Sequence, residues 1–425
     1  MSNIKIGTHD GVFHCDEALA CYLLKLLPRY KDADIVRSRD DSILDTCDIV
    51  VDVGKIYDPS KHRYDHHMRT FNESISTVIK KPGYDSTIKL SSAGLIYCHF
   101  GHEIIKQLYP ELSDNETEKV FKKIYNTMIV EIDGIDNGIP MFDAEPLYRI
   151  VTDLSSRVAN LNAPWNKKDV DEEVQFKKAM ELVGEEFMRI IQYTVETWLP
   201  ARSIVQDGIE KRFEVDPSGE IIELSQFVPW SDHLYTLEKE LNVEPPLKYI
   251  IFQGDVYRIR AVPVTYSSFV PRIPLPEPWA GLRDEKLVEV CGIEGAVFRR
   301  ITIFLIIFAN VSKECLNKFS KYYLSMSIKM VSFSLRDLRS IDDPAVGAYG
   351  CAIGVPGSLV CLGCQMFCLC LCYFRCVQDP SIISQRDTEP ICVRQWCYIS
   401  RGGEDHAAES GEDDLKFCAK SNILV

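Results

Sequence analysis

Apolar runs and helical stripes alternate along the first third of the chain. Residues 3–11 (NIKIGTHDG) predict a short buried strand that ends in a polar loop. Residues 16–30 place apolar side chains at helical spacing, and residues 47–54 (CDIVVDVG) form a second apolar run that closes with Asp52. Strand, helix and strand in this order predict the βαβ unit of a parallel sheet. We therefore expect an α/β fold, with helices flanking the sheet.

Two further helices are predicted before residue 140. The first covers residues 91–105. The second covers residues 116–134, where one apolar stripe includes Val120, Phe121, Ile124, Met128, Ile129 and Ile132. This second helix leads into EIDGIDNG (residues 131–138), so it carries Asp133 and Asp136 at its C-terminal end.

The hydrophobic pattern changes after a polar stretch at residues 160–173, which we interpret as a domain boundary. A long amphipathic helix is predicted from there to about Trp198. Residues 200–265 resemble short strands joined by turns, which predicts a smaller α+β module with an antiparallel sheet. We expect a first domain at residues 1–165 and a second, substrate-binding domain at residues 170–298.

Residues 299–425 differ in character and are interpreted as a divergent, Cys-rich tail. Residues 344–374 contain no charged side chain, and residues 359–374 are almost entirely apolar. A membrane span needs about 20 such residues, so contact with a membrane through the tail is an alternative. The cysteine pattern lacks the separated pairs of a zinc site. A tail that does not fold with the rest of the chain is the favoured interpretation.

Charge and cysteine content narrow the function classes. The formal net charge of −14 argues against a protein that coats nucleic acid by overall electrostatics, although a local basic cleft is compatible with it. Only four of the sixteen cysteines lie in residues 1–290, which is typical of a reduced compartment. The N-terminal segment shows no targeting peptide, so we expect the cytoplasm or nucleus.

Histidines and carboxylates cluster where the predicted strands end. THDGVFHCDE (8–17) follows the first strand, Asp52 closes the second, and YDHH (64–67) follows a loop with a third candidate strand. The carboxyl ends of parallel strands meet at one sheet edge. That edge would collect a set of side chains comprising His9, His14, Asp16, Asp52, His66, His67 and an aspartate from residues 131–138.

Taken singly, each of these residues suits a structural role. A loop histidine is usually solvated or packed in a core, and Asp16 is placed to cap the following helix. Taken together, mixed imidazole and carboxylate groups favour a site for divalent metal ions. Seven candidates are too many for one ion and suit two, with Asp52 as the bridging carboxylate.

These motifs resemble those of a known family. THDGVFHCDEALA, DIVVDVG, YDPSKHRYDHHMRTF and EIDGIDNG resemble the four motifs of the DHH phosphoesterase superfamily, and most closely the melanocyte-proliferating-gene exonuclease family. The resemblance covers residues 4 to about 298. It implies a DHH-type domain followed by a smaller substrate-binding domain, with the active cleft between them. It also implies 3′–5′ exonucleolytic cleavage of RNA, in the nucleus or the mitochondrion.

The resemblance further implies two divalent ions that activate a water, with manganese favoured and magnesium as the alternative. His9 and His14 are similar to ligands of the first ion, and Asp52 to the bridge. The second ion would take Asp16, His66 and one of Asp133 or Asp136, and spacing does not choose between these two aspartates. His67 is similar to the residue that contacts the scissile phosphate. We also consider Arg63 and Arg69 as substrate-binding candidates.

One departure from the family pattern affects the expected function. After CGIEGAVF (291–298) the family continues with a His and Gly-rich phosphate loop, whereas this chain reads RRITIFLIIFANV. We therefore expect a truncated second domain. Two alternatives follow: hydrolysis of small phosphoanhydrides or cyclic dinucleotides, and a catalytically impaired isoform that binds metal or RNA. A homo-oligomer is compatible with the sequence.

Overall fold

The computed structural model describes residues 3–167, 169–253, 256–266, 268–299 and 305–308. All of them belong to one compact unit, Met1–Met326. The membrane span and the zinc site considered for the tail lie outside the described residues. Among the helices that are described, none has the length and apolar character needed to cross a membrane.

The first sheet has five strands in the order β2-β1-β3-β5-β4. Their bounds are β1 Lys5–Thr8, β2 Asp34–Arg37, β3 Ile49–Val51, β4 Tyr57–Asp58 and β5 Arg63–Tyr64. The first four strands in this order are parallel, as predicted, whereas β4 pairs antiparallel with β5 and makes the sheet mixed. A single 3-10 turn, Pro59–Lys61, joins β4 to β5. That connection is too short for the crossover that a parallel pair requires.

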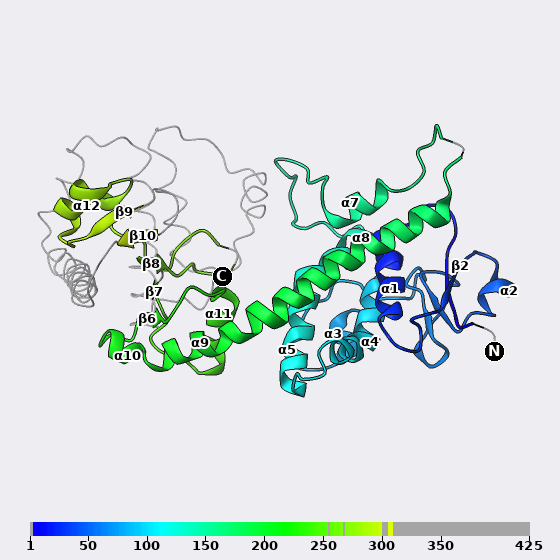
Figure 1. The fold of residues 1–425 in the computed structure, drawn as a ribbon, viewed down its shortest axis with the longest axis horizontal. Helices are drawn as coiled ribbons and strands as arrows, with labels where there is room; N and C mark the ends of the chain where they lie inside the picture. Colours follow the sequence, from blue (N-terminus) through cyan, green and yellow to red (C-terminus); the bar gives the residue numbers. More distant parts are fainter. Residues whose placement is uncertain (1–2, 168, 254–255, 267, 300–304, 309–425) are drawn as a thin grey trace, which may run out of the picture. The chain divides into compact units, whose positions relative to one another are not determined.

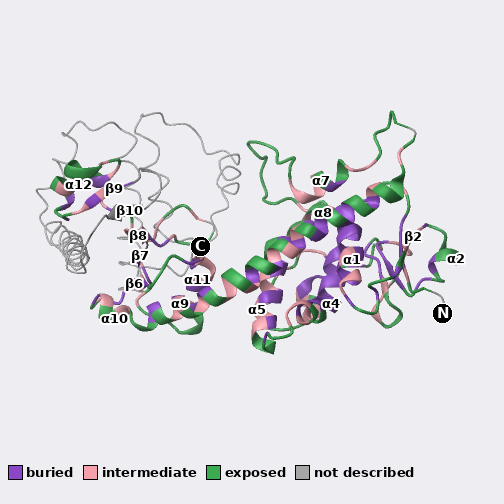
Figure 2. Ribbon diagram, viewed as in Figure 1, coloured by how far each residue is buried: buried purple, intermediate pink, exposed green. Residues whose placement is uncertain are grey.

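Helix α1 (Cys15–Lys25) is the centre of the first core, and nine of its eleven residues are buried. It packs against α4 (Ser92–Leu108) and α8 (Glu172–Tyr193) (Figure 1). Figure 2 shows α1 buried nearly all round, as expected of a helix enclosed by other elements. Contact with α8 depends on Gly184, because a Cβ there would lie 2.1 Å from the Tyr22 ring.

The predicted helix at residues 116–134 forms in three parts. These are α5 (Asp114–Ile124), a π-helical turn (Tyr125–Ile129) and α6 (Val130–Asp136). The side chain of Asp133 is fully buried, whereas that of Asp136 is 18% exposed. Three short helices complete this part of the chain: α2 Asp41–Leu44, α3 Ile75–Ile79 and α7 Leu154–Ala159.

A second sheet follows, in the order β6-β7-β8-β10-β9. Its strands are β6 Ile221–Leu224, β7 Tyr249–Gln253, β8 Tyr257–Ala261, β9 Ala296–Arg299 and β10 Leu305–Phe308. Strands β6 and β7 are parallel and the other pairs are antiparallel, so the expectation of a purely antiparallel sheet is wrong. Strand β10 lies beyond residue 298, where we placed the end of the second domain. The division at residues 165–170 into two domains stays a prediction.

Helices occupy much of the region that we expected to consist of short strands. After a π-helical turn at Thr194–Trp198 come α9 (Leu199–Glu210), α10 (Arg212–Val215) and α11 (Ser231–Glu240). The expectation is therefore wrong for residues 199–215 and 231–240, whereas β6 at Ile221–Leu224 is one of the expected short strands. Ala201, Val205 and Ile209 are spaced four apart and are all buried, which is the stripe of an amphipathic helix. A 3-10 turn (Glu277–Trp279) and α12 (Asp284–Cys291) complete the described elements.

Candidate metal centre

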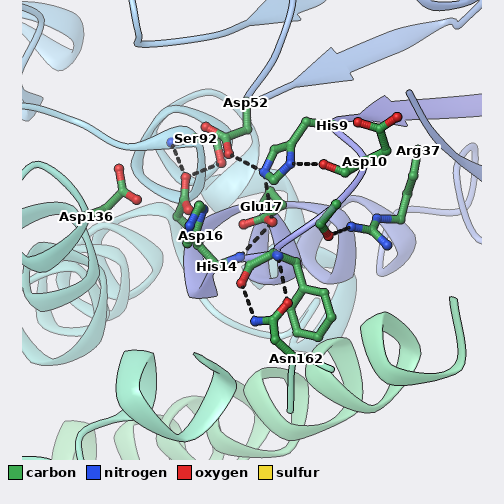
Figure 3. A network of polar contacts seen from close by, with 12 residues as sticks. His9, Asp10, His14, Asp16, Glu17, Arg37, Asp52, Ser92, Asp136 and Asn162 are labelled. Atoms are coloured by element: carbon green, nitrogen blue, oxygen red, sulfur yellow. Dashed lines mark hydrogen bonds and ion pairs between the residues drawn. The ribbon is translucent and has the colours of Figure 1, made fainter. Parts of the chain in front are cut away.

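Parallel strands bring three separate chain segments to one edge of the first sheet. His9 follows β1, Asp52 follows β3, and His66 follows β5. Nε2 of His9 lies 3.3 Å from Oδ2 of Asp52 (Figure 3), and Nε2 of His66 lies 3.1 Å from Oδ1 of the same carboxylate. Asp52 therefore lies between two imidazoles, as its place after the central strand suggested.

The backbone of Asp52 is unusual. Its φ is 61°, in the left-handed region that non-glycine residues seldom adopt. Such conformations cost free energy and cluster at functional sites. The strained backbone at the point where a buried carboxylate faces two histidines supports a functional role for this residue.

The first turn of α1 adds two carboxylates. Oε1 of Glu17 lies 3.1 Å from Nε2 of His9 and accepts the backbone N–H of His14 at 2.8 Å. Asp16 accepts hydrogen bonds from the backbone N–H and the hydroxyl of Ser92, at 3.2 and 2.7 Å (Figure 3). Sequence reasoning missed Glu17, although its position three residues after His14 is that of the acidic partner in a capping box.

The loop before α1 is also held by hydrogen bonds from a residue that is distant in the sequence. Asn162 accepts the backbone N–H of Phe13 at 3.0 Å and donates to its carbonyl at 2.8 Å (Figure 3). Both backbone groups of Phe13 are thus satisfied by a single amide. Asn162 lies in the polar stretch that we interpreted as a boundary, so that stretch helps to position His14.

Three overlapping sets of side chains can hold a metal ion in the described part of the chain. They are His9, His14, Glu17 and Asp52; Asp52, His66 and His67; and His14, Asp16 and Asp136. Within each set the ligand atoms lie within 4.8 Å of one another. Asp52 and His14 each belong to two sets, so the three sets form one continuous cluster.

The geometry distinguishes the two aspartates that spacing did not separate. Oδ1 of Asp133 accepts the backbone N–H of Ser91 at 2.9 Å and its hydroxyl at 2.7 Å. Oδ2 of Asp136, by contrast, lies 3.3 Å from Nε2 of His66. The structure thus directs Asp133 toward the start of α4 and Asp136 toward the histidine cluster.

Unpaired buried atoms show that this cluster fits a cation. Oδ1 of Asp16, Oε2 of Glu17 and Nδ1 of His66 are buried without a hydrogen-bond partner. Buried carboxylate oxygens are costly unless they are paired or coordinate a metal ion. A divalent ion would satisfy the orphaned oxygens, and carboxylate with imidazole is a suitable donor set for manganese or magnesium.

The pKa values of the cluster are shifted by burial and by the closeness of its charged groups. Burial opposes the charged form of His9, but hydrogen bonds to Asp52 and Glu17 outweigh it and raise its pKa to about 10. Burial likewise opposes ionisation of Asp52, yet His66 and His9 hold its pKa well below the usual range. Burial and the nearby carboxylate of Asp16 raise the pKa of Asp136. Without metal ions, protons compensate part of the negative charge.

His67 differs from the other histidines of the cluster in its exposure. Its side chain is 58% exposed, and Nδ1 lies 2.7 Å from Oδ1 of Asp65. This hydrogen bond raises the pKa of His67. Because Nδ1 is engaged by Asp65, the other ring nitrogen is the one that is free to meet a ligand.

A cavity of about 600 Å³ opens onto the cluster. His14, Asp16, His66, His67 and Asp136 line it, together with polar side chains that sequence analysis did not single out: Lys89, Asn137, Ser155 and Ser156. Arg63 and Arg69 do not line it. Arg63 donates to the carbonyls of Lys61, His62 and Cys47, and Arg69 is exposed.

Comparison with known proteins identifies relatives over most of the chain. A family model named for the MYG1 exonucleases, with the description "Uncharacterised protein family (UPF0160)", matches residues 5–322. This span reaches beyond residue 298, where we expected the resemblance to end. No solved structure matches the chain.

Curated relatives come from animals, a slime mould and yeasts. The MYG1 exonuclease of Homo sapiens is 49% identical over 310 residues, which are 72% of this chain and 82% of the human protein. A MYG1 protein of Dictyostelium discoideum is 46% identical over 311 residues, or 72% of this chain and 92% of the relative. For a MYG1 protein of Saccharomyces cerevisiae the identity is 39% over 306 residues, with 69% and 88% of the two chains covered.

Proposed function

Because this chain belongs to the MYG1 exonuclease family, we propose that it is a metal-dependent phosphodiesterase that removes nucleotides from the 3′ end of RNA. The observation that carries the proposal is the continuous cluster of three ligand sets, which opens into one cavity beside His67. The named activity of the human relative supports hydrolysis of phosphodiester bonds. The choice of RNA, the 3′–5′ direction and the kinship with DHH phosphoesterases rest on the motif resemblance.

The proposed cofactor is a pair of divalent ions, with manganese favoured over magnesium. His9, His14 and Glu17 would hold one ion, Asp16, His66 and Asp136 the other, and Asp52 would serve both. When bound, such ions activate water as a nucleophile and neutralise charge on the phosphate. Ser92 holds the carboxylate of Asp16 in place, and the His14 N–H orients Glu17.

The chain's own cations complete the environment for a phosphate. His67 donates from Nδ1 to Asp65, and in its protonated imidazolium form it would also donate a hydrogen bond from Nε2 to a phosphate oxygen. Lys89 lines the same cavity, and none of the ion pairs among the described residues involves it. Both groups would stabilise charge that develops on the phosphate oxygens during in-line attack.

A single-stranded RNA with a 5′ label tests the proposal. The purified full chain is incubated with it in manganese, in magnesium and in chelator, beside the double variant His66→Ala/His67→Ala. We expect a ladder of products that shorten from the 3′ end, with metal required and the double variant inactive. His62→Ala is the matched control, because His62 is exposed and does not line the cavity.

Two results would contradict the proposal. Cleavage at internal positions would exclude an exonuclease. Hydrolysis of small phosphoanhydrides or cyclic dinucleotides without shortening of the longer RNA would favour a small-molecule hydrolase. The proposed location, in the nucleus, the cytoplasm or the mitochondrion, does not rest on the mode of cleavage, and neither result tests it.

A further inference from the structure

A second hollow lies apart from the metal centre, where α5 meets α9 and α11. Its volume is about 730 Å³, and Lys119, Lys122 and Arg202 are among its lining residues. A smaller hollow of about 280 Å³ adjoins it, since both are lined by Lys123, Trp198, Asp232 and Tyr266. We call the two hollows together the basic-aromatic groove. None of its residues lines the cavity at the metal centre.

The acidic side chains of the groove are already engaged. Asp232 forms an ion pair with Lys123 and accepts the indole N–H of Trp198 at 3.1 Å. Glu240 forms an ion pair with Arg202. The contacts of the third acid, Glu118, are with side chains outside the groove, namely Lys81, Tyr84 and His102.

Three cations of the groove lack an acidic partner within the described part of the chain. No ion pair among the described residues involves Lys119, Lys122 or Arg260. The ammonium of Lys119 donates to the neutral amide of Asn115 at 2.8 Å, that of Lys122 lies over the ring of Tyr84, and Arg260 lies over the ring of Trp230. Burial and the neighbouring guanidinium of Arg202 lower the pKa of Lys119. An anion beside Lys119 would offset this repulsion from Arg202.

Aromatic side chains stand exposed beside the unpaired cations. The exposed fractions are 63% for Phe227, 59% for Tyr266 and 50% for Tyr193. All three line the smaller hollow, and Tyr266 lines both. Exposed rings next to lysines and arginines are the combination by which proteins hold single-stranded nucleic acid, since bases stack on the rings while cations follow the phosphates.

We propose that the basic-aromatic groove binds single-stranded RNA at nucleotides away from the end that enters the metal centre. Lys119 and Lys122 would contact phosphates, and Tyr266 and Phe227 would stack on bases. Charge complementarity favours this occupant, because the groove presents unpaired cations on a chain whose net charge is −14. The choice of RNA as the nucleic acid rests on the proposed function.

Binding without turnover tests this surface separately from the nuclease activity. Full chain and a fluorescent RNA of about 20 nucleotides are titrated in chelator, at several salt concentrations, and the anisotropy is measured. The variants are Lys119→Ala/Lys122→Ala and Tyr266→Ala/Phe227→Ala. Lys177→Ala/Lys178→Ala is the charge-matched control, because both lysines are exposed on α8, outside the groove.

We expect each groove variant to weaken RNA binding on the order of tenfold, as stacking and phosphate contacts are lost. For the lysine pair, the slope of log affinity against log salt should fall by about 1.4, at roughly 0.7 for each phosphate contact. Lys119→Arg/Lys122→Arg should retain the affinity, which separates lost charge from misfolding. The control should bind like the unaltered chain.

Unchanged affinity in both groove variants would overturn the proposal. If RNA affinity is unchanged but the same substitutions alter self-association of the chain in sedimentation, the proposal is also overturned, because the groove would then bind a second copy of the chain. Weaker RNA binding by the groove variants in chelator would support the proposal whether or not the chain cleaves RNA. The outcome of the binding assay is therefore distinct from that of the nuclease assay.

Discussion

Nδ1 of His67 lies 2.7 Å from Oδ1 of Asp65, two residues earlier in the chain. The same carboxylate accepts the backbone N–H of His67 at 3.1 Å and that of Lys55 at 2.6 Å. Asp65 is 1% exposed, so its orientation is set by these three donors. The imidazole that borders the cavity is therefore oriented by a buried anion.

Replacing that anion should change the titration of His67. The hydrogen bond that His67 donates to Asp65 is the largest cause of the raised pKa of His67. In Asp65→Asn we expect the pKa of His67 to fall, so that the imidazole loses its proton at lower pH. NMR titration of the ring protons measures this directly. An unchanged His67 pKa would mean that Asp65 does not control the charge of the ring.

Substitutions of Asp133 and Asp136 should have different effects, one on stability and the other on metal affinity. Asp136→Asn removes a charged oxygen beside His66, so we expect manganese affinity to fall by at least about tenfold. Asp133→Ala leaves the N–H and hydroxyl of Ser91 without an acceptor in a buried site, which should destabilise the fold by about 1–3 kcal/mol. Calorimetric metal titration and urea unfolding distinguish the two. Reversed phenotypes would assign the ligand to Asp133.

The stability of the metal-free chain should fall as pH rises above neutrality. The pKa of His9 in the fold is about 10, above its ordinary 6.5, so its contribution is complete below pH 6.5 and is lost toward pH 10. Burial raises the pKa of Asp133 to about 7, so the folded chain again binds protons more strongly than the unfolded chain. Urea unfolding in chelator between about pH 6 and 9 measures the trend.

Metal ions should remove much of this pH dependence, because they replace the protons. At a concentration about one hundred times the dissociation constant, a bound ion stabilises the fold by about 2.7 kcal/mol. Two results would contradict the charge distribution described here. One is a free energy of unfolding in chelator that does not change with pH, and the other is a free energy of unfolding that does not change when manganese replaces the chelator.

Glu17 is expected to matter for metal binding although it is not among the ligands that the motif resemblance implies. Glu17→Gln keeps an oxygen for the N–H of His14 but weakens the contact with His9. We expect manganese affinity to fall by about 10–100-fold with little change in helix content. Circular dichroism and metal titration measure the two quantities. Equal affinity in the variant would assign Glu17 a purely structural role.

Gly94 should resist substitution because α4 approaches a buried carboxylate there. A Cβ at Gly94 would lie 2.3 Å from Oδ1 of Asp133, so we expect Gly94→Ala to cost about 1–3 kcal/mol of stability. Gly134→Ala is the matched control, because nothing lies within 4 Å of a Cβ at that helical position. The control should gain up to about 1 kcal/mol from helix propensity. Equal effects at the two glycines would refute the close approach.

Local pattern was sufficient for part of the first sheet and for its longer helices. Alternation of apolar runs and stripes predicted β1, α1, β3, α4 and the α5–α6 helix, because each buries one continuous face. It failed at residues 199–215 and 231–240, where α9, α10 and α11 form instead of short strands. It also missed the antiparallel strand β4, which spans only two residues.

The sequence by itself determined which residue types gather at the sheet edge, since the order of parallel strands places His9, Asp52 and His66 after successive carboxyl ends. Only the tertiary structure placed Asp136 beside His66, brought Glu17 to His9, and brought α5 and α11 together around the basic-aromatic groove. Those outcomes depend on how side chains from distant segments pack and share hydrogen bonds. A linear pattern carries spacing along the chain but not those distances.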